Sequence, residues 1–333
     1  MILAVGLDEK LRRRFFTQEQ WAQLGCLAEI RVLPCPEDLT APANVPILGE
    51  AEGLMTGWGC PPLTGEVLDL CPELKVIVHT GGSVRSFVPD EVFARGIRVT
   101  SQTELNAEPV AQFCLAQILL AAKGVGRAAR EYAASKSTTA FDEAWTEGIG
   151  VYGARVGLIG YGRVAHRLIG MLQGFSMRIL LNSPYVTEDC ARELGVELAG
   201  MEEIMSTCDV ISVHLGDTPD NHGAVSGDLL SLVKPGATFI NTARGIVVDE
   251  VGLIRECRTG RFDAVLDVTC PEVPAPDSEL WTLPNVTLTP HWAGSLGREL
   301  TLLGQGALTN MEEYLAGAPL TGQVDPDIAA YIA

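Results

Sequence analysis

The sequence predicts an α/β fold of two domains, each built on a parallel sheet. Three observations lead to this prediction. The chain has 333 residues, enough for two ordinary domains, and an apolar content of 47% that can fill their cores. Short apolar runs alternate with helical patterns along nearly the whole chain. A glycine-rich turn joins an apolar run to an amphipathic helix near the middle of the chain.

The first part of the chain, residues 1 to 105, reads as a small α/β domain. Its expected strands are Ile2–Val5, Ile30–Leu33, Gly53–Thr56, Val76–His79 and Ile97–Thr100. Helical patterns lie between them, around Thr17–Leu24, Gly65–Leu70 and Asp90–Ala94. Because strands that alternate with helices pair in parallel, a parallel sheet is expected here.

The alternation restarts at Val156 after one or two helices in Asn106–Tyr132 and a polar stretch, Ala133–Gly150, that we interpret as the linker. The later strands are expected at Val196–Leu198, Val210–Val213, Thr238–Asn241, Ala264–Val268 and Val286–Leu288. A last helix, Leu300–Ala316, is expected to return to the first domain. The predicted domains are therefore 1–120 completed by 298–333, and 121–297.

The glycine-rich turn predicts a dinucleotide-binding site. It follows the apolar run 156–159 and reads Gly160-Tyr161-Gly162-Arg163-Val164-Ala165, and a helix and a second apolar run come next. Gly160 permits a tight turn, and Gly162 lets backbone N–H groups approach a pyrophosphate at the helix N-terminus. Ala165 in place of a third glycine still allows the helix to pack closely on the strand. A structural glycine turn is the alternative, and the strand–turn–helix context disfavours it.

Composition argues against several classes of function. There are 24 basic and 42 acidic residues and a net charge of −18, which disfavours a nucleic acid or an anionic membrane as partner. No uninterrupted apolar run approaches the ~18 residues of a membrane span, and the N-terminus has no leader pattern. The nine cysteines are scattered without metal-ligand spacing, which predicts reduced thiols, a cytoplasmic location and no metal site.

Polar residues follow three successive expected strands of the second sheet. Arg244 follows 238–241, Asp267 ends 264–268 with Glu272 five positions on, and His291 follows 286–288. Ligands bind outside the carboxyl ends of strands in open α/β sheets, so these side chains are expected to converge on the cofactor. An arginine clamps a carboxylate, and a histidine exchanges a proton near neutral pH. Together they suit hydride transfer at a 2-keto or 2-hydroxy acid.

Each of these residues also has a structural interpretation. Taken singly, Arg244 fits a salt bridge in a loop, Glu272 a solvated carboxylate and His291 a capping or packing residue. Their joint placement favours catalysis.

The motifs around these residues resemble the D-isomer-specific 2-hydroxyacid dehydrogenase family over nearly the full chain. They are Val-Gly-Leu-Ile-Gly-Tyr-Gly (156–162), His-Leu-Gly-Asp-Thr-Pro (214–219), Lys-Pro-Gly-Ala-Thr-Phe-Ile-Asn-Thr-Ala-Arg-Gly (234–245), Leu-Asp-Val-Thr-Cys-Pro-Glu (266–272) and Thr-Pro-His (289–291). The resemblance implies an α/β fold with a Rossmann-type doubly wound parallel sheet and a smaller flavodoxin-like α/β substrate domain, with the active site between them.

The resemblance also implies roles for individual residues. Arg244 would bind the substrate carboxylate and polarise the carbonyl, and His291 would exchange the proton while paired with Glu272. Asp267 would hold the nicotinamide carboxamide. The substrate carboxylate would also meet backbone N–H groups of Gly81-Gly82-Ser83. The implied cofactor-binding set is Gly160, Tyr161, Gly162, Arg163, Val164, Ser183, His214, Thr218, Thr242 and Asp267.

Several positions depart from the family pattern. Asn182-Ser183-Pro184 replaces the acidic residue expected at the end of the second strand, and no arginine stands beside Ser183, so we predict NAD as cofactor. Arg85 stands where relatives have a small or amide side chain; it could reach an extra anionic group or pair with Asp90 or Glu91. Trp58 and Trp292 are candidates for walls of the substrate pocket or for core residues.

The sequence thus predicts a cytoplasmic NAD(H)-dependent D-2-hydroxyacid dehydrogenase, a homodimer by resemblance, with a small 2-keto or 2-hydroxy acid as partner and neither nucleic acid nor membrane. A non-catalytic NAD(H)-sensing protein on the same fold is the alternative. A β-hydroxyacid dehydrogenase fits poorly, because no lysine follows Lys234 to act as the acid.

Overall fold

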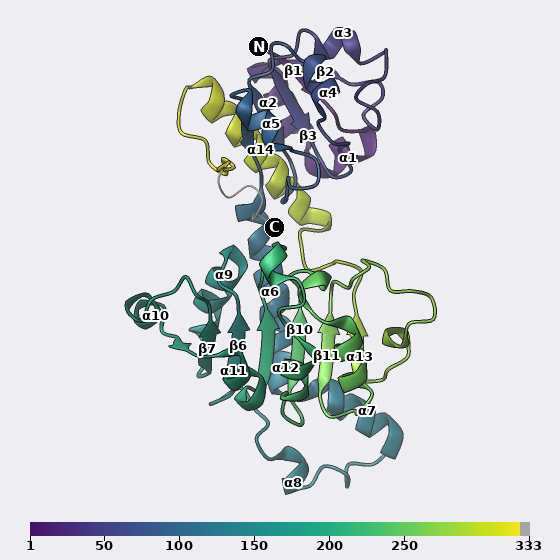
Figure 1. Ribbon diagram of the computed structural model, residues 1–333, viewed down its shortest axis with the longest axis vertical. Coiled ribbons are helices and arrows are strands. Elements are labelled where there is room, and N and C mark those ends of the chain that lie inside the picture. Colours follow the sequence, from purple (N-terminus) through teal and green to yellow (C-terminus); the bar gives the residue numbers. More distant parts are fainter. Residues whose placement is uncertain (327–333) are drawn as a thin grey trace. The chain divides into compact units, whose positions relative to one another are not determined.

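The computed structural model describes residues 1–326, which form two compact units (Figure 1). Unit 1 comprises Met1–Asn106 and the segment from Ser295 onward, and unit 2 comprises Ala107–Gly294. The chain therefore leaves unit 1 inside helix α6 (Thr103–Ala122) and returns after Gly294. The sequence-based boundaries, 120/121 and 297/298, differ from these because most of α6 packs in the core of unit 2, a choice that helical periodicity does not reveal.

The structure also corrects the expected linker, residues 133–150, because this segment lies inside unit 2. It overlaps the end of α7 (Val125–Ser135) and contains α8 (Glu143–Thr146). Arg130 of α7 forms an ion pair with Asp263. No residue of α7 is buried. The polar composition therefore reflects a solvent-exposed helix rather than a connection between domains.

Unit 1 contains a five-stranded parallel sheet in the order β2-β1-β3-β4-β5. Its strands are β1 (Ile2–Val5), β2 (Glu29–Val32), β3 (Gly53–Thr56), β4 (Val76–His79) and β5 (Arg98–Thr100). β3 and β4 are buried along their whole length, as the apolar runs predict for a sheet covered on both faces. The order 2-1-3-4-5 is that of flavodoxin-like domains, which confirms the predicted class.

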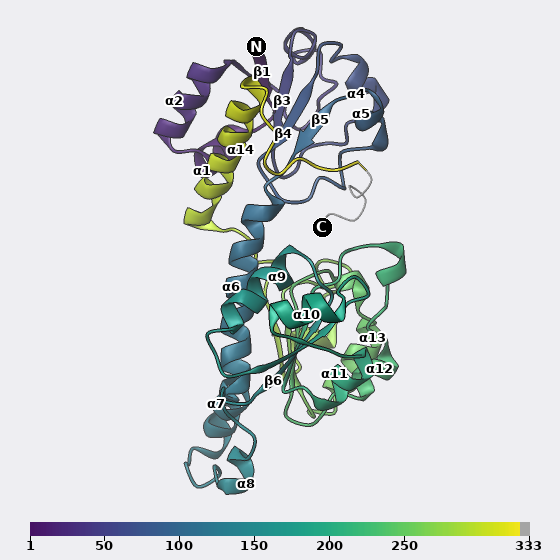
Figure 2. The same cartoon turned by 90° about the vertical axis from the view of Figure 1, so that its left-hand side faces the viewer.

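Helices cover both faces of the unit 1 sheet. On one face, Leu3 and Val5 pack with residues of α1 (Glu9–Phe15), α2 (Gln18–Leu27) and α14 (Leu300–Leu315). Figure 2 shows α14 beside α1 and α2, so the last helix returns to the first domain as predicted. On the other face, Ala4 packs with residues of α3 (Val45–Leu48), α4 (Gly65–Asp69) and α5 (Asp90–Ala94). The alternation of Leu3, Ala4 and Val5 between faces is the period of a strand.

Unit 2 contains a seven-stranded parallel sheet in the order β12-β11-β10-β9-β6-β7-β8 (Figure 1). The strands are β6 (Arg155–Ile159), β7 (Arg178–Asn182), β8 (Glu197–Leu198), β9 (Val210–Val213), β10 (Thr238–Asn241), β11 (Asp263–Leu266) and β12 (Val286–Leu288). Read from β8, this is the doubly wound order 3-2-1-4-5-6 with one added strand. The order reverses between β6 and β9, so the switch point lies beside the glycine-rich turn.

Two layers of helices bury the unit 2 sheet. One core joins α6, α9 (Arg163–Leu172) and α10 (Glu188–Leu194) to the sheet, and the other joins α11 (Met201–Thr207), α12 (Gly227–Ser231) and α13 (Glu250–Cys257). Short 3₁₀ helices lie at Pro219–Asn221, Gly245–Val247, Glu279–Trp281 and Gly297–Glu299.

One described helix, α6, is long and apolar enough to cross a membrane by length and composition alone. The core helix of a water-soluble protein passes the same test. Ala111, Cys114 and Ile118 of α6 are buried completely in the unit 2 core, which accounts for part of its apolar sequence.

Candidate active site

The glycine-rich turn of unit 2 has the geometry of a pyrophosphate site. Gly160 has φ +96°, and a Cβ added there would lie 2.7 Å from the backbone oxygen of His214. A side chain at this position would therefore collide with the chain after β9. Gly162 is the N-cap of α9 and makes no side-chain capping bond, and an added Cβ would meet no described atom within 4 Å. The N-terminus of α9 thus presents its backbone to open space, which suits an anion.

The other residues of this turn have distinct surroundings. The hydroxyl of Tyr161 is 2.9 Å from Nδ1 of His166 one turn along α9. Arg163 is exposed at the first position of the helix. Val164 is half-buried against the unit 2 core, and Ala165 is fully buried, as close packing of helix on strand requires.

The remaining predicted cofactor residues follow β7, β9 and β10. Ser183 comes directly after β7, and its Oγ accepts a hydrogen bond from Tyr185 N at 3.2 Å. Thr218 lies in a tight loop in which its backbone N donates to Gly216 O at 3.0 Å. Thr242 is buried, and its hydroxyl lies 3.1 Å from Sγ of Cys114 on α6. In the structure, Thr242 therefore links β10 to the helix layer.

His214 combines burial with an unsatisfied nitrogen. It follows β9 directly, and its Nε2 is buried with no hydrogen-bond partner among residues 1–326. Burial lowers the pKa of His214 to about 4, so the ring is neutral near pH 7. A buried polar atom without a partner beside the switch point is consistent with a bound dinucleotide.

The loop after β10 holds Arg244 through the side chain of Asn241. Asn241 Nδ2 donates to Arg244 O at 2.9 Å, and its Oδ1 accepts from Ala243 N at 3.0 Å. A Cβ added to Gly245 would lie 2.0 Å from the backbone carbon of Thr269. This close backbone contact, which only glycine permits, joins the Arg244 loop to the loop after β11.

That second loop brings Glu272 to His291, as the family resemblance implies. Thr269 Oγ1 donates to the carbonyls of Pro271 and Glu272, at 2.8 and 3.0 Å. Glu272 Oε1 then lies 2.6 Å from Nδ1 of His291. The two side chains are 59% and 49% exposed, so solvent reaches the pair. Because Nδ1 faces the carboxylate, Nε2 is the ring nitrogen left for another partner.

Asp267 anchors the segment that carries His291. Asp267 is 1% exposed. Its Oδ1 accepts from Thr289 Oγ1 at 2.5 Å and Trp292 N at 2.7 Å, and its Oδ2 accepts from Ala293 N at 2.9 Å. The backbone N of His291 donates to Asp267 O at 3.0 Å. In this structure Asp267 is therefore a positioning residue for the histidine, and its contact with a nicotinamide carboxamide stays a prediction.

The backbone of His291 is in the left-handed region, with φ +55°. A residue with a Cβ adopts this conformation at an energetic cost, and such residues cluster at functional sites. The four hydrogen bonds to Asp267 from Thr289, His291, Trp292 and Ala293 offset the energetic cost of this backbone conformation.

Three supporting residues, Asn241, Thr269 and Thr289, have no role that the sequence predicted. Each lies in one of the motifs that carry the family resemblance, within two positions of a residue with a predicted role. Their presence in those motifs was the available signal, but only the fold identifies their partners.

Unit 1 holds the predicted turn for the substrate carboxylate. Gly81 O accepts from Gln102 N at 2.8 Å, and Gly82 O accepts from Thr103 Oγ1 at 3.1 Å. Because N–H and C=O of one trans peptide point in opposite directions, the N–H groups of Gly82 and Ser83 point away from Gln102 and Thr103. This orientation fits the predicted role.

Arg85 is exposed two residues beyond this turn, and its backbone N donates to Ser83 Oγ at 3.4 Å. Of the two acidic partners considered for it, Glu91 accepts from Arg95 at 2.5 Å. Arg95 also binds Asp69 at 2.7 Å. The structure therefore assigns Glu91 to Arg95.

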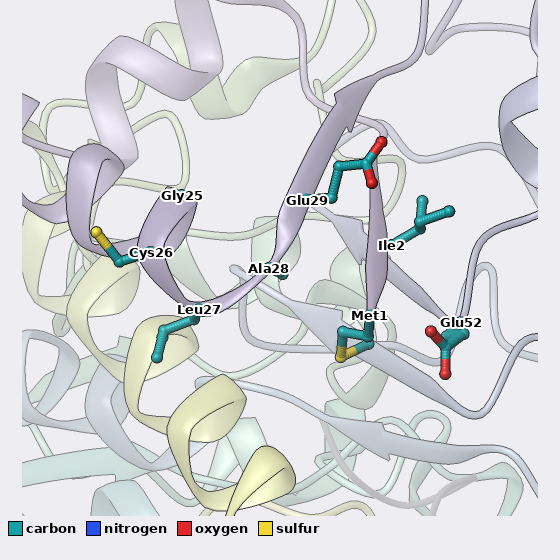
Figure 3. Close-up of a pocket in the computed structure, with 8 residues that line it drawn as sticks. All are labelled: Met1, Ile2, Gly25, Cys26, Leu27, Ala28, Glu29 and Glu52. Atoms are coloured by element: carbon teal, nitrogen blue, oxygen red, sulfur yellow. The ribbon is translucent and has the colours of Figure 1, made fainter.

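The pocket in Figure 3 is unrelated to these residues. It is lined by Met1, Ile2, Gly25, Cys26, Leu27, Ala28, Glu29 and Glu52. Met1 and Ile2 begin β1 and Glu29 begins β2, so the pocket lies at the amino edge of the unit 1 sheet. Ligands of open α/β sheets bind at the opposite edge.

Comparison with known proteins identifies the nucleotide-binding part. Residues 115–293 match the family model described as "D-isomer specific 2-hydroxyacid dehydrogenase, NAD binding domain". A D-3-phosphoglycerate dehydrogenase of Mycobacterium leprae is 30% identical over 311 residues, which cover 93% of this chain and 57% of that protein. The chain thus spans little more than half the length of that relative. A glyoxylate reductase of Korarchaeum cryptofilum is 30% identical over 257 residues, 77% of each chain.

Solved structures agree over nearly the whole chain. A phosphoglycerate oxidoreductase from Rhizobium etli has a TM-score of 0.77 at 27% identity and covers 98% of this chain and 99% of its own. The TT0316 protein from Thermus thermophilus has a TM-score of 0.73 at 28% identity, with coverage of 98% and 100%.

Proposed function

Because the chain belongs to the D-isomer specific 2-hydroxyacid dehydrogenase family, we propose that it is an NAD(H)-dependent oxidoreductase that interconverts a 2-keto acid and a D-2-hydroxy acid. The observation that carries this proposal is the contact of 2.6 Å between His291 and Glu272, on a segment that Asp267 holds in place. A protein that only bound NAD(H) would not require this arrangement.

In the direction of reduction, Arg244 binds the substrate carboxylate with its planar guanidinium and polarises the keto oxygen. NADH, when bound, supplies the hydride that the carbonyl carbon receives. His291 is protonated at the start, and its Nε2 gives a proton to the oxygen as that oxygen becomes a hydroxyl. Glu272 stabilises the imidazolium through Nδ1 and keeps the ring in one orientation. Oxidation of the hydroxy acid uses the same residues with neutral His291 as the base.

The residues after β6, β7 and β9 fit the cofactor. The N-terminus of α9 faces the space beside Gly162 and would hold the pyrophosphate. Ser183 would meet a ribose hydroxyl at the end of β7. No cation in Asn182-Ser183-Pro184 is available for a 2′-phosphate, which supports NADH over NADPH.

The experiment is a measurement of NADH oxidation with a panel of 2-keto acids that includes glyoxylate, hydroxypyruvate and pyruvate. We expect turnover with at least one of them, a preference for NADH over NADPH in kcat/KM, and a D-configured product. NADH binding without turnover of any keto acid would instead support the alternative, a non-catalytic NAD(H)-sensing protein.

We also propose a cytoplasmic homodimer. All nine cysteines are free thiols, which supports a reducing compartment. Large apolar side chains are exposed along α6 and α7, namely Leu105, Leu120, Val125 and Tyr132, as in a surface that a second copy covers. Light scattering should give twice the mass of 35.6 kDa for the chain. A monomer in solution would contradict this.

A further inference from the structure

The carboxyl edge of the unit 1 sheet places an indole ring against the Gly81 turn. β3 and β4 are neighbours, with Thr56 opposite His79 in register, so Trp58 and Gly81 each lie two residues beyond paired positions. A Cβ added to Gly81 would be 2.7 Å from Nε1 and 2.9 Å from Cδ1 of Trp58. The edge of the indole therefore lies in contact with the turn.

Trp58 is held in place but is not buried. Phe15, fully buried at the end of α1, meets the indole edge-on with ring centroids 5.1 Å apart. Gly57 lets the chain approach the core, because a Cβ there would be 2.3 Å from Leu7 Cδ2. Even so, 39% of Trp58 is exposed. A large apolar surface is thus fixed beside the turn and partly exposed to solvent.

A second side chain against Gly81, that of His79, is also uncharged. His79 is 1% exposed, and its Nε2 would be 2.6 Å from a Cβ on Gly81. Burial lowers the pKa of His79 to about 3, and the ring lies 4.8 Å from that of Phe87 between centroids. The surroundings of Gly81 on this side are aromatic and neutral, and a charged group brought against them would lose hydration without a partner.

We propose that Trp58 determines substrate specificity, forming the wall against the substituent on carbon 3 of the 2-keto acid and selecting short, uncharged substituents. The proposal rests on the proposed function and on the predicted contact of the substrate carboxylate with the N–H groups of Gly82 and Ser83. Carbon 3 is only three bonds from the carboxylate oxygens. A substrate held at this turn therefore presents its carbon 3 substituent to side chains that contact the turn, and the indole is the largest of them.

Arg85 provides the opposite prediction, a preference for substrates with a second anionic group. It lies two residues beyond Ser83, within about 8 Å along the backbone, and a guanidinium there would favour a second anionic group on the substrate. Two matched pairs of keto acids separate the two outcomes: hydroxypyruvate with 3-phosphohydroxypyruvate, and 2-oxobutanoate with oxaloacetate. The members of each pair differ chiefly in a phosphate or a carboxylate beyond carbon 3.

For the wild-type protein we expect kcat/KM to favour the uncharged member of each pair by at least tenfold. Trp58→Ala should raise kcat/KM for 4-methyl-2-oxopentanoate relative to pyruvate by at least tenfold, because the wall is removed. Trp281→Phe is the matched control in unit 2, where Nε1 of Trp281 donates to Ala275 O. It should leave the kcat/KM ratio of each charged and uncharged pair, and that of 4-methyl-2-oxopentanoate to pyruvate, unchanged. The proposal is overturned if Trp58→Ala leaves the kcat/KM ratio of 4-methyl-2-oxopentanoate to pyruvate unchanged. It is also overturned if the wild-type protein prefers the charged member of each pair and Arg85→Gln abolishes that preference.

A binding measurement tests the wall independently of turnover. Oxamate, an unreactive analogue of a small keto acid, should quench tryptophan fluorescence of the NADH-bound protein, and Trp58→Phe should lose most of this change. Trp58→Phe keeps an aromatic contact with Phe15, so folding is preserved. Quenching that Trp58→Phe leaves intact would overturn the proposal. If the quenching depends on Trp58 but the protein reduces no keto acid, the proposed dehydrogenase activity is refuted, while the role of Trp58 as a wall beside the ligand is kept.

Discussion

At the scale of single residues, the candidate site depends on short contacts that hold a few side chains in unusual positions. His291 keeps φ +55° because Asp267 accepts hydrogen bonds on both sides of it. The side chain of Asn241 holds the Arg244 loop with two hydrogen bonds to its backbone. Buried polar groups of this kind are valuable only when every partner is present, since an unsatisfied one costs about 1–3 kcal/mol.

The first prediction concerns the charge and shape of Arg244. Arg244→Lys keeps the positive charge but loses the planar fork that binds a carboxylate with two parallel hydrogen bonds. We expect kcat/KM for keto acid reduction to fall at least tenfold, which corresponds to about 1.4 kcal/mol of transition-state binding. The Kd for NADH should change little. A kinetically silent Arg244→Lys would place the carboxylate clamp elsewhere, with Arg85 the next candidate.

The second prediction concerns Glu272 and the pH dependence of activity. Glu272→Gln keeps the size of the side chain and a hydrogen bond to His291 but removes the negative charge that favours the imidazolium. Reduction requires the imidazolium, so the alkaline limb of kcat/KM for reduction should move to lower pH. Oxidation requires the neutral ring, so its acidic limb should move in the same direction. Lower activity with both limbs unmoved would mean that Glu272 does not act through His291.

At the scale of elements, strand ends and helix starts create the binding positions. The turn from β6 to α9 needs Gly160 for its backbone conformation and Gly162 for open space. Replacing these two glycines should therefore have different effects on the structure. A side chain at Gly160 would collide with protein backbone, whereas a Cβ at Gly162 would meet no described atom within 4 Å.

The third prediction uses that difference. Gly162 has φ −135°, which any residue adopts, so Gly162→Ala should fold with nearly unchanged stability. Its Cβ would occupy the space in which we propose that the pyrophosphate binds, so we expect the Kd for NADH, measured by calorimetry, to rise at least tenfold. Gly170→Ala, in the same helix with no described atom within 4 Å of the added Cβ, is the matched control and should leave the Kd unchanged. Equal Kd values for both variants would argue against a pyrophosphate at this turn.

At the scale of the whole molecule, each unit carries one histidine that burial keeps neutral. The pKa of His79 is lowered to about 3 in unit 1 and that of His214 to about 4 in unit 2. The unfolded chain binds protons at these residues near the ordinary histidine pKa of about 6.5, while the folded chain does not. Between about pH 6.5 and pH 4 the unfolded chain therefore holds more protons, and stability falls as the pH falls.

The fourth prediction follows from this linkage. Between pH 7 and pH 5, each buried histidine should cost about 2 kcal/mol of the free energy of unfolding. His79→Asn should reduce the loss of stability measured by urea denaturation. His166→Asn, at an exposed position of α9, should leave the pH dependence unchanged. Unfolding that is equally sensitive to pH in both variants would show that His79 is not buried in its neutral form.

Much of the fold could be predicted from the sequence, because its signals are local. The expected strands 2–5, 53–56, 76–79, 210–213, 238–241 and 286–288 have the observed bounds. Apolar runs between turn residues were sufficient to locate these parallel strands. The glycine-rich turn and the polar residues at strand ends could be located for the same reason.

The sequence by itself therefore determined the α/β class, the order of elements and the residues that stand at the carboxyl ends of strands. Only the tertiary structure decided where the chain passes between units, because Ala111 and Ile118 of α6 reveal a buried side but not which core receives it. It also decided that Asp267 supports the His291 segment and that Trp58 meets Gly81. Such contacts join residues far apart in sequence, and they exist only once parallel strands have brought their ends together.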